Sequence, residues 1–65
     1  MYQLSICPDT EIIHLNKKTI AQAKSAALEY YPSALFMDVI DYIQIAIYNR
    51  TDAGLEHIGN IWRVN

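Results

Sequence analysis

Apolar residues occupy every second position at the start of the chain. In the range Tyr2–Cys7 they alternate with polar or small residues. A period of two predicts a strand, because successive side chains of a strand point to opposite faces. The turn residues Pro8–Thr10 follow, and Glu11–Leu15 then predicts a second strand that completes an N-terminal hairpin. An extended lead into the next element is the alternative for Glu11–Leu15.

A helix is predicted for Ile20–Tyr30. Thr19 and Gln22 fit a capping box, in which the threonine hydroxyl accepts a hydrogen bond from the amide three residues on. Apolar residues then recur at steps of three and four on one face, at Ile20, Ala23, Ala27 and Tyr30. This stripe is rich in alanine, so the helix can lie close to a sheet. Pro32 ends the helix, because the residue before a proline is pushed out of the helical region.

The segment from Leu35 to Tyr48 fits two descriptions. Its apolar residues recur at helical spacing, but they also alternate with a period of two. β-Branched residues are frequent in it and suit a pleated sheet, so we predict two strands that are joined by a tight turn near Asp41. In the second strand, isoleucines alternate with a row of aromatic, polar and small residues. The isoleucines are Ile43, Ile45 and Ile47, and the row, called the tyrosine row below, is Tyr42, Gln44, Ala46 and Tyr48.

The rest of the chain predicts one more strand. Thr51–Gly54 is a turn in which Gly54 is free to adopt positive φ. Leu55–Val64 forms the last strand, with Gly59 marking a bulge. The predicted order is β-(β)-α-β-β-β, which makes residues 1–65 a single α+β domain: one helix packed on one face of a small, mainly antiparallel sheet.

The composition is unusually apolar for so short a chain. Of 65 residues, 52% are hydrophobic and 18% are charged. A chain of this size buries only about 60% of the surface that it exposes when unfolded, so self-association or a partner surface is predicted, with a tightly packed monomer as the alternative. Cys7 is the only cysteine, and no zinc-ligand spacing joins it to His14 or His57. We therefore predict no disulfide, no metal and no cofactor.

The sequence disfavours two classes of partner, nucleic acids and membranes. Seven acids and five bases give a net charge of −2, and no basic run is present to neutralise a phosphate backbone. The charge distribution therefore argues against nucleic-acid binding. No stretch of about 18 apolar residues predicts a membrane span, and the first residues lack the pattern of a signal peptide. Together with the lone thiol, this predicts a cytoplasmic protein.

A single helix covers one face of the predicted sheet and leaves the other face open. The tyrosine row then presents aromatic and polar side chains together, a mixture that is enriched at recognition surfaces. Trp62 near the end of the last strand is a further candidate anchor. We predict partner binding by Tyr42, Gln44, Tyr48 and Trp62. The alternative is that the tyrosines stabilise neighbouring strands and that Trp62 belongs to the core.

Asp38 and Asp41 straddle the predicted turn and form a second candidate site. They are either a patch that attracts a basic partner or ordinary turn and solubility residues. The sequence does not support a catalytic function, because nucleophilic chemistry needs a serine or cysteine beside a histidine that an acid holds in place. His14 and His57 lie in separate predicted elements. We therefore predict no catalytic residues.

The layout resembles a group of small phage-borne domains in which a strand leads into a capped, alanine-rich helix, three antiparallel strands and a late tryptophan. Some small anti-CRISPR proteins, including inhibitors of type I effector complexes, share it. The resemblance covers Ile12–Arg63, about four-fifths of the chain. The corresponding positions are Thr19, Ala23, Lys24, Ala27, the strand with Ile43, Ile45 and Ile47, and Trp62.

This resemblance implies a phage or mobile-element protein that binds a host defence protein, such as a CRISPR effector, in the host bacterial cytoplasm and inhibits it sterically. Family members that occupy a nucleic-acid channel use basic side chains, whereas this chain is mildly acidic. The implied target is therefore a basic surface or an interface between subunits. The alternative function is a homodimeric structural or assembly module, which associates through the open sheet face or through Leu55–Val64 as an edge strand.

Overall fold

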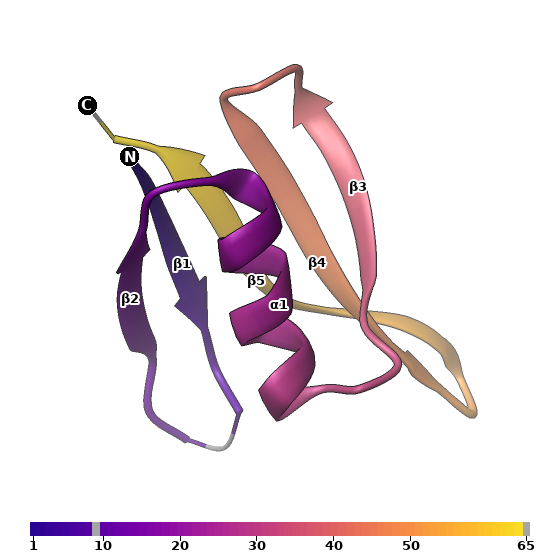
Figure 1. Ribbon diagram of the computed structural model, residues 1–65. Helices are drawn as coiled ribbons and strands as arrows, with labels where there is room; N and C mark the ends of the chain where they lie inside the picture. Colours follow the sequence, from indigo (N-terminus) through magenta and orange to yellow (C-terminus); the bar gives the residue numbers. More distant parts are fainter. Residues whose placement is uncertain (9, 65) are drawn as a thin grey trace.

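One helix packs against a five-stranded antiparallel sheet in the computed structural model, which describes residues 1–8 and 10–64 (Figure 1). Asp9, a predicted turn residue, lies outside the described residues. The elements are β1 (Tyr2–Ile6), β2 (Ile13–Lys17), α1 (Ile20–Tyr30), β3 (Leu35–Ile40), β4 (Gln44–Thr51) and β5 (Gly54–Arg63). The predicted α+β class and the order β-β-α-β-β-β are confirmed, including the second strand, which begins two residues later than predicted.

The strands lie in the order β2-β1-β5-β4-β3, and each neighbouring pair is antiparallel. The prediction that residues 55–64 form an edge strand was wrong, because β5 pairs with β1 on one side and with β4 on the other. That arrangement joins the first strand of the chain to the last, a long-range pairing that local sequence patterns do not reveal. The edges of the sheet are β2 and β3.

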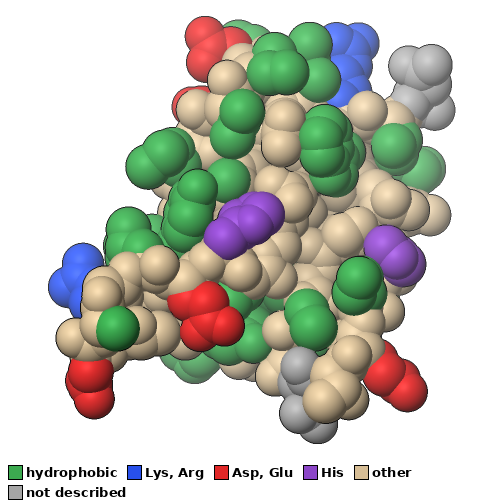
Figure 2. Space-filling model, turned by 180° about the vertical axis from the view of Figure 1, so that it is seen from behind, with side chains coloured by type: hydrophobic (Ala, Val, Ile, Leu, Met, Phe, Trp, Pro, Cys, Tyr) green, Lys and Arg blue, Asp and Glu red, His purple; other side chains and the backbone are tan. Residues whose placement is uncertain are grey.

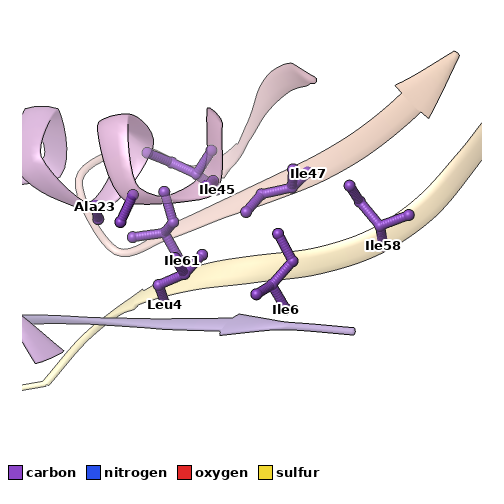
Figure 3. Close-up of a cluster of buried hydrophobic side chains, with 9 residues drawn as sticks. Leu4, Ile6, Ala23, Ile45, Ile47, Ile58 and Ile61 are labelled. Atoms are coloured by element: carbon purple, nitrogen blue, oxygen red, sulfur yellow. The ribbon is translucent and has the colours of Figure 1, made fainter. Parts of the chain in front are cut away.

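Two cross-strand rows of the sheet face the helix. One row is Asp38, Ile45, Ile61, Leu4 and Leu15, and the other is Phe36, Ile47, Gly59, Ile6 and Ile13. Their central side chains pack with Ile58 against three helical alanines, Ala23, Ala26 and Ala27 (Figure 3). Full burial of an aliphatic side chain stabilises the fold by roughly 1.5–3 kcal/mol, so this single cluster holds the helix on the sheet.

The helix has the predicted bounds and the predicted cap. Thr19 Oγ1 accepts a hydrogen bond from the Gln22 amide at 3.1 Å, and Gln22 Oε1 accepts one from the Lys18 amide at 3.2 Å. The prediction that Tyr30 lies on the buried face was wrong, since its side chain is exposed. Tyr31, where the chain leaves the helix, packs against the core instead and donates a hydrogen bond to the Cys7 carbonyl at 2.9 Å.

The helix lies off-centre on the sheet. Its backbone lies closest to β1, β2 and β5, and it reaches β3 through the Lys24 side chain, which lies over the Phe36 ring (Figure 1). Because the single helix α1 is displaced toward β1 and β2, the β3 side of the sheet has little covering on either face.

Among residues 1–8 and 10–64, no helix has the length and apolar character needed to cross a membrane.

The turn between β3 and β4 is longer than predicted. It occupies residues 41–43, so β4 begins at Gln44, and Tyr42 adopts a positive φ of 62°. The Ile43 amide donates to the Ile40 carbonyl at 3.0 Å. Ile43, which the alternation groups with Ile45 and Ile47, does not join them in the core, because its side chain lies in the turn and is 44% exposed.

Replacing Tyr42 with glycine is expected to raise the free energy of unfolding by about 0.5–1 kcal/mol, because glycine adopts positive φ without the steric penalty of a Cβ. The tyrosine side chain is 74% exposed, so its removal loses little packing. Urea denaturation measures the difference. The control is Tyr48→Gly in the regular part of β4, which is expected to lower stability. A less stable Tyr42→Gly protein would show that the turn depends on the tyrosine ring.

Both predicted glycine features of β5 are confirmed. Gly54 adopts a φ of +125° at the start of β5, where the chain leaves the turn and pairs with Thr51. The bulge lies beside Gly59: Ile47 is opposite Gly59 and Tyr48 is opposite His57, so Ile58 is the extra residue. Gly59 also allows β5 to lie close to β1, because a Cβ at position 59 would lie 2.3 Å from the Ser5 carbonyl oxygen.

Candidate functional site

The sheet face opposite α1, called the open face below, has no element packed on it among the described residues (Figure 2). Strand registers place its side chains in four cross-strand rows. The first row is Ile40, Gln44, Trp62, Gln3 and Asn16; the second is Met37, Ala46, Asn60, Ser5 and His14; the third is Leu35, Tyr48 and His57; the fourth is Arg50 and Leu55. The predicted open face is therefore present.

The two sides of the open face differ in chemistry. On the β3 side, Leu35, Met37 and Ile40 are large, apolar and exposed. On the β1 and β2 side, the same rows end in polar residues such as Gln3 and His14. The apolar side continues the rows of Tyr48 and Trp62, so aromatic and aliphatic surface lie together on one half of the face.

Trp62 lies on the open face and outside the core cluster. It stands between Gln44 on β4 and Gln3 on β1, and its side chain is 39% exposed. A tryptophan that is half-covered by its strand neighbours is held in place and still presents much of its ring. Such rigid aromatic side chains are the type that dominates binding energy at protein interfaces.

A group of hydrogen-bonded side chains fixes the centre of the open face. The Asn60 amide oxygen accepts a hydrogen bond from Gln44 Nε2 at 3.4 Å and lies 3.2 Å from His57 Nε2. The Tyr48 ring lies against the His57 ring, with 5.3 Å between centroids and a tilt of 47°. These contacts restrict rotamers before any partner arrives, which lowers the entropy lost on binding.

The six predicted site residues separate into two groups on opposite faces. Gln44, Tyr48 and Trp62 lie on the open face, as predicted. Tyr42, Asp38 and Asp41 line a hollow of about 340 Å³ on the helix side, together with Ile20, Lys24 and Ile45. The placement of Tyr42 in the open row was wrong, because the three-residue turn takes it out of the alternating strand and turns it to the helix side.

The residues that sequence reasoning missed are Leu35, Met37 and Ile40. The alternation between Leu35 and Val39 is visible in the sequence, but it does not say which set faces the helix. The pairings of Leu35 with Tyr48 and of Met37 with Ala46 settle the question. A register shift between Asp38 and Ile40 then brings Ile40 opposite Gln44, which an unbroken alternation would not do.

One serine and one histidine meet on the polar side of the open face. Ser5 Oγ lies 2.7 Å from His14 Nδ1, and His14 is exposed on the edge strand β2. A nucleophilic serine needs such a histidine to be oriented by a third group and needs donors for the oxyanion. Within the described chain, the hydrogen bond links β1 to β2, and this is the role that the geometry supports. Residues 1–8 and 10–64 hold no group of three His, Cys, Asp or Glu side chains able to bind a metal ion.

No protein-family model matches this chain, and neither a curated protein nor a solved structure matches it. The candidate functional site is therefore the one that the geometry defines: the open face, with Trp62, Tyr48 and Gln44 beside the apolar side chains of β3.

Proposed function

We propose that this chain is a small protein-binding domain that uses the open face to engage a component of a host defence system, such as a CRISPR effector, and inhibits it sterically. The observation that supports binding is the uncovered sheet face on which Trp62 and Tyr48 lie beside exposed apolar residues of β3. The defence partner and the host bacterial cytoplasm come from the resemblance to small phage-borne inhibitors. The mechanism needs no catalytic group.

The size of the face suits a stable protein complex. The molecule measures 36 × 23 × 16 Å along its principal axes. A face bounded by its two longer dimensions covers roughly 800 Å², which is the area that each partner contributes to a standard interface.

The charge of the face indicates the partner's chemistry. In the four rows of the open face, Arg50 is the charged residue other than histidine, and it lies in the outermost row beside the β4–β5 turn. A nucleic acid would find this one basic side chain in these rows, which is too little to neutralise a phosphate backbone. The matching surface is therefore a largely uncharged, apolar area of a protein, and Asp38 and Asp41 on the helix side are not part of the contact.

Trp62→Ala is expected to weaken partner binding by about 30-fold or more, since loss of a central aromatic anchor removes about 2 kcal/mol or more. Plaque assays on hosts that carry a panel of defence systems identify the target, and calorimetry with the purified target gives the affinity. The control is Tyr42→Ala, which removes an exposed ring on the opposite side and should leave affinity unchanged.

Two outcomes would contradict the proposal. Plating that is unchanged against every defence system would remove the proposed partner class. A target that binds the Trp62→Ala protein as tightly as the wild type, while Tyr42→Ala weakens binding, would move the contact from the open face to the helix side. Circular dichroism of both variants establishes that the fold is retained.

A further inference from the structure

The two edge strands of the sheet differ in how they are protected against pairing with another chain. Natural sheets protect edges with charged residues, prolines, bulges or a covering element. On β2, three of the five residues are polar: His14, Asn16 and Lys17. On β3, the single charged residue is Asp38, and four large apolar side chains are 38% to 55% exposed. They are Leu35, Met37, Val39 and Ile40.

The irregularity that could protect β3 against pairing with another chain lies near its C-terminal end. The register shift between Asp38 and Ile40 leaves Leu35–Asp38 as a regular stretch paired to β4. The helix lies over β1, β2 and β5 and does not cover this edge. The outer backbone groups of β3 are therefore accessible to a strand from another molecule.

We propose that two copies of this chain associate by antiparallel pairing of β3 with β3 about a two-fold axis at Met37. The result is a continuous sheet with twice the five strands of one copy. Both open faces then lie on the same side of that sheet. The pairing goes beyond the proposed partner binding and does not depend on it.

Symmetry restricts the register of such a pairing. In an antiparallel pair, directly opposite residues point to the same face of the sheet. The two-fold axis must therefore pass beside one residue, which lies opposite the same residue of the second copy. An axis at Asp38 would oppose two carboxylates, which is destabilising. An axis at Phe36 would bring the two Phe36 rings together and, with them, the two Lys24 ammonium groups, which lie 5.5 Å from the ring centroids; like charges so placed are destabilising. An axis at Met37 pairs residues 36–38 within the regular stretch and brings two exposed, uncharged side chains together at the centre.

The Met37 register also matches opposite charges across the axis. In it, Phe36 of one copy lies directly opposite Asp38 of the other, on the helix side. The Lys24 ammonium group lies over the Phe36 ring, 5.5 Å from its centroid. Opposite side chains on neighbouring strands have Cβ atoms about 4.5–5.5 Å apart, so the second copy's Asp38 comes within reach of Lys24. Symmetry produces this ion pair twice. Lys24 also lines the helix-side hollow with Asp38 of its own chain, so in the dimer each ammonium group lies between two carboxylates. This added charge complementarity favours a second copy as the occupant of the edge.

Cysteine crosslinking tests the register. In the proposed dimer, the two copies of residue 37 have Cα atoms about 4.5–5.5 Å apart, within the range that a disulfide spans. Met37→Cys is expected to form a covalent dimer rapidly under mild oxidation. The matched control is Leu35→Cys, on the same strand and face, whose two copies lie four residues apart and should crosslink slowly. Equal rates for the two variants would overturn the proposed pairing.

A charge exchange tests the ion pair and keeps this proposal separate from partner binding. Lys24→Asp and Asp38→Lys are each expected to weaken the dimer about tenfold, because each places like charges together twice. The double variant should restore the wild-type dissociation constant, measured by sedimentation equilibrium. Neither residue lies on the open face, so binding of a defence protein should be unchanged in all three. A wild-type protein that sediments as a monomer at every concentration, or a double variant as weak as the single ones, would overturn the dimer.

Discussion

Replacing Ile45 with aspartate is expected to unfold the protein. Ile45 is 3% exposed and lies opposite Ile61 in the row that faces α1. The substitution removes roughly 1.5–3 kcal/mol of apolar burial and places a carboxylate in the core, where desolvation of an unpaired charge costs several kcal/mol more. A chain of this length is stable by only about 3–10 kcal/mol. Far-ultraviolet circular dichroism and the loss of a cooperative urea transition measure the outcome.

Ile43→Asp is the matched control for this substitution. It makes the same chemical change two positions earlier, where the side chain lies in the β3–β4 turn and is exposed. Its effect should stay within about 0.5 kcal/mol, the range of ordinary surface substitutions. A folded Ile45→Asp protein together with an unfolded Ile43→Asp protein would mean that the register of β4 is wrong.

Gly59→Ala is expected to lower the free energy of unfolding by about 3 kcal/mol, at the upper end of overpacking effects. A Cβ at position 59 would lie 2.3 Å from the Ser5 carbonyl oxygen and 3.0 Å from the Ile6 Cα. Both are backbone atoms of β1, so they can move away only if the pairing of β1 with β5 is disturbed. Chemical denaturation of the variant gives the loss directly.

Gly54→Ala separates the steric effect from the conformational effect of adding a methyl group. Gly54 has a φ of +125°, and no atom would lie within 4 Å of an added Cβ. Only the backbone penalty applies there, about 1–2 kcal/mol. If Gly59→Ala proves no more damaging than Gly54→Ala, then β1 does not approach β5 as closely as the structure indicates.

Much of the fold could be predicted because its signals are local. The hydroxyl of Thr19 and the stop at Pro32 define α1, and period-two alternation identifies each strand. The position of β5 at the centre of the sheet could not be predicted, because pairing between β1 and β5 joins residues far apart in sequence. Alternation reports that a strand has two faces but not which strand lies beside it.

The candidate site was predictable only where the alternation is unbroken. Gln44 and Tyr48 could be placed on one face because β4 is regular between them, and Trp62 follows from the regular end of β5. Tyr42 could not, because a residue with positive φ in a turn no longer follows the period of the strand. The exposure of Met37 depends on the pairing of β3 with β4 at the edge of the sheet, which puts Met37 on the face opposite the helix and which no local pattern specifies.

The central place of β5 affects how the protein forms during synthesis. Without β5, the sheet consists of two unconnected hairpins, β2-β1 and β4-β3. The ribosome makes residues 54–63 after the other elements of this sheet, so the isoleucines of the earlier strands are exposed to solvent until then. Folding domains in this state depend on non-local contacts and are open to aggregation. The nascent chain therefore gains this core only when β5 has emerged from the ribosome and inserts between the two hairpins.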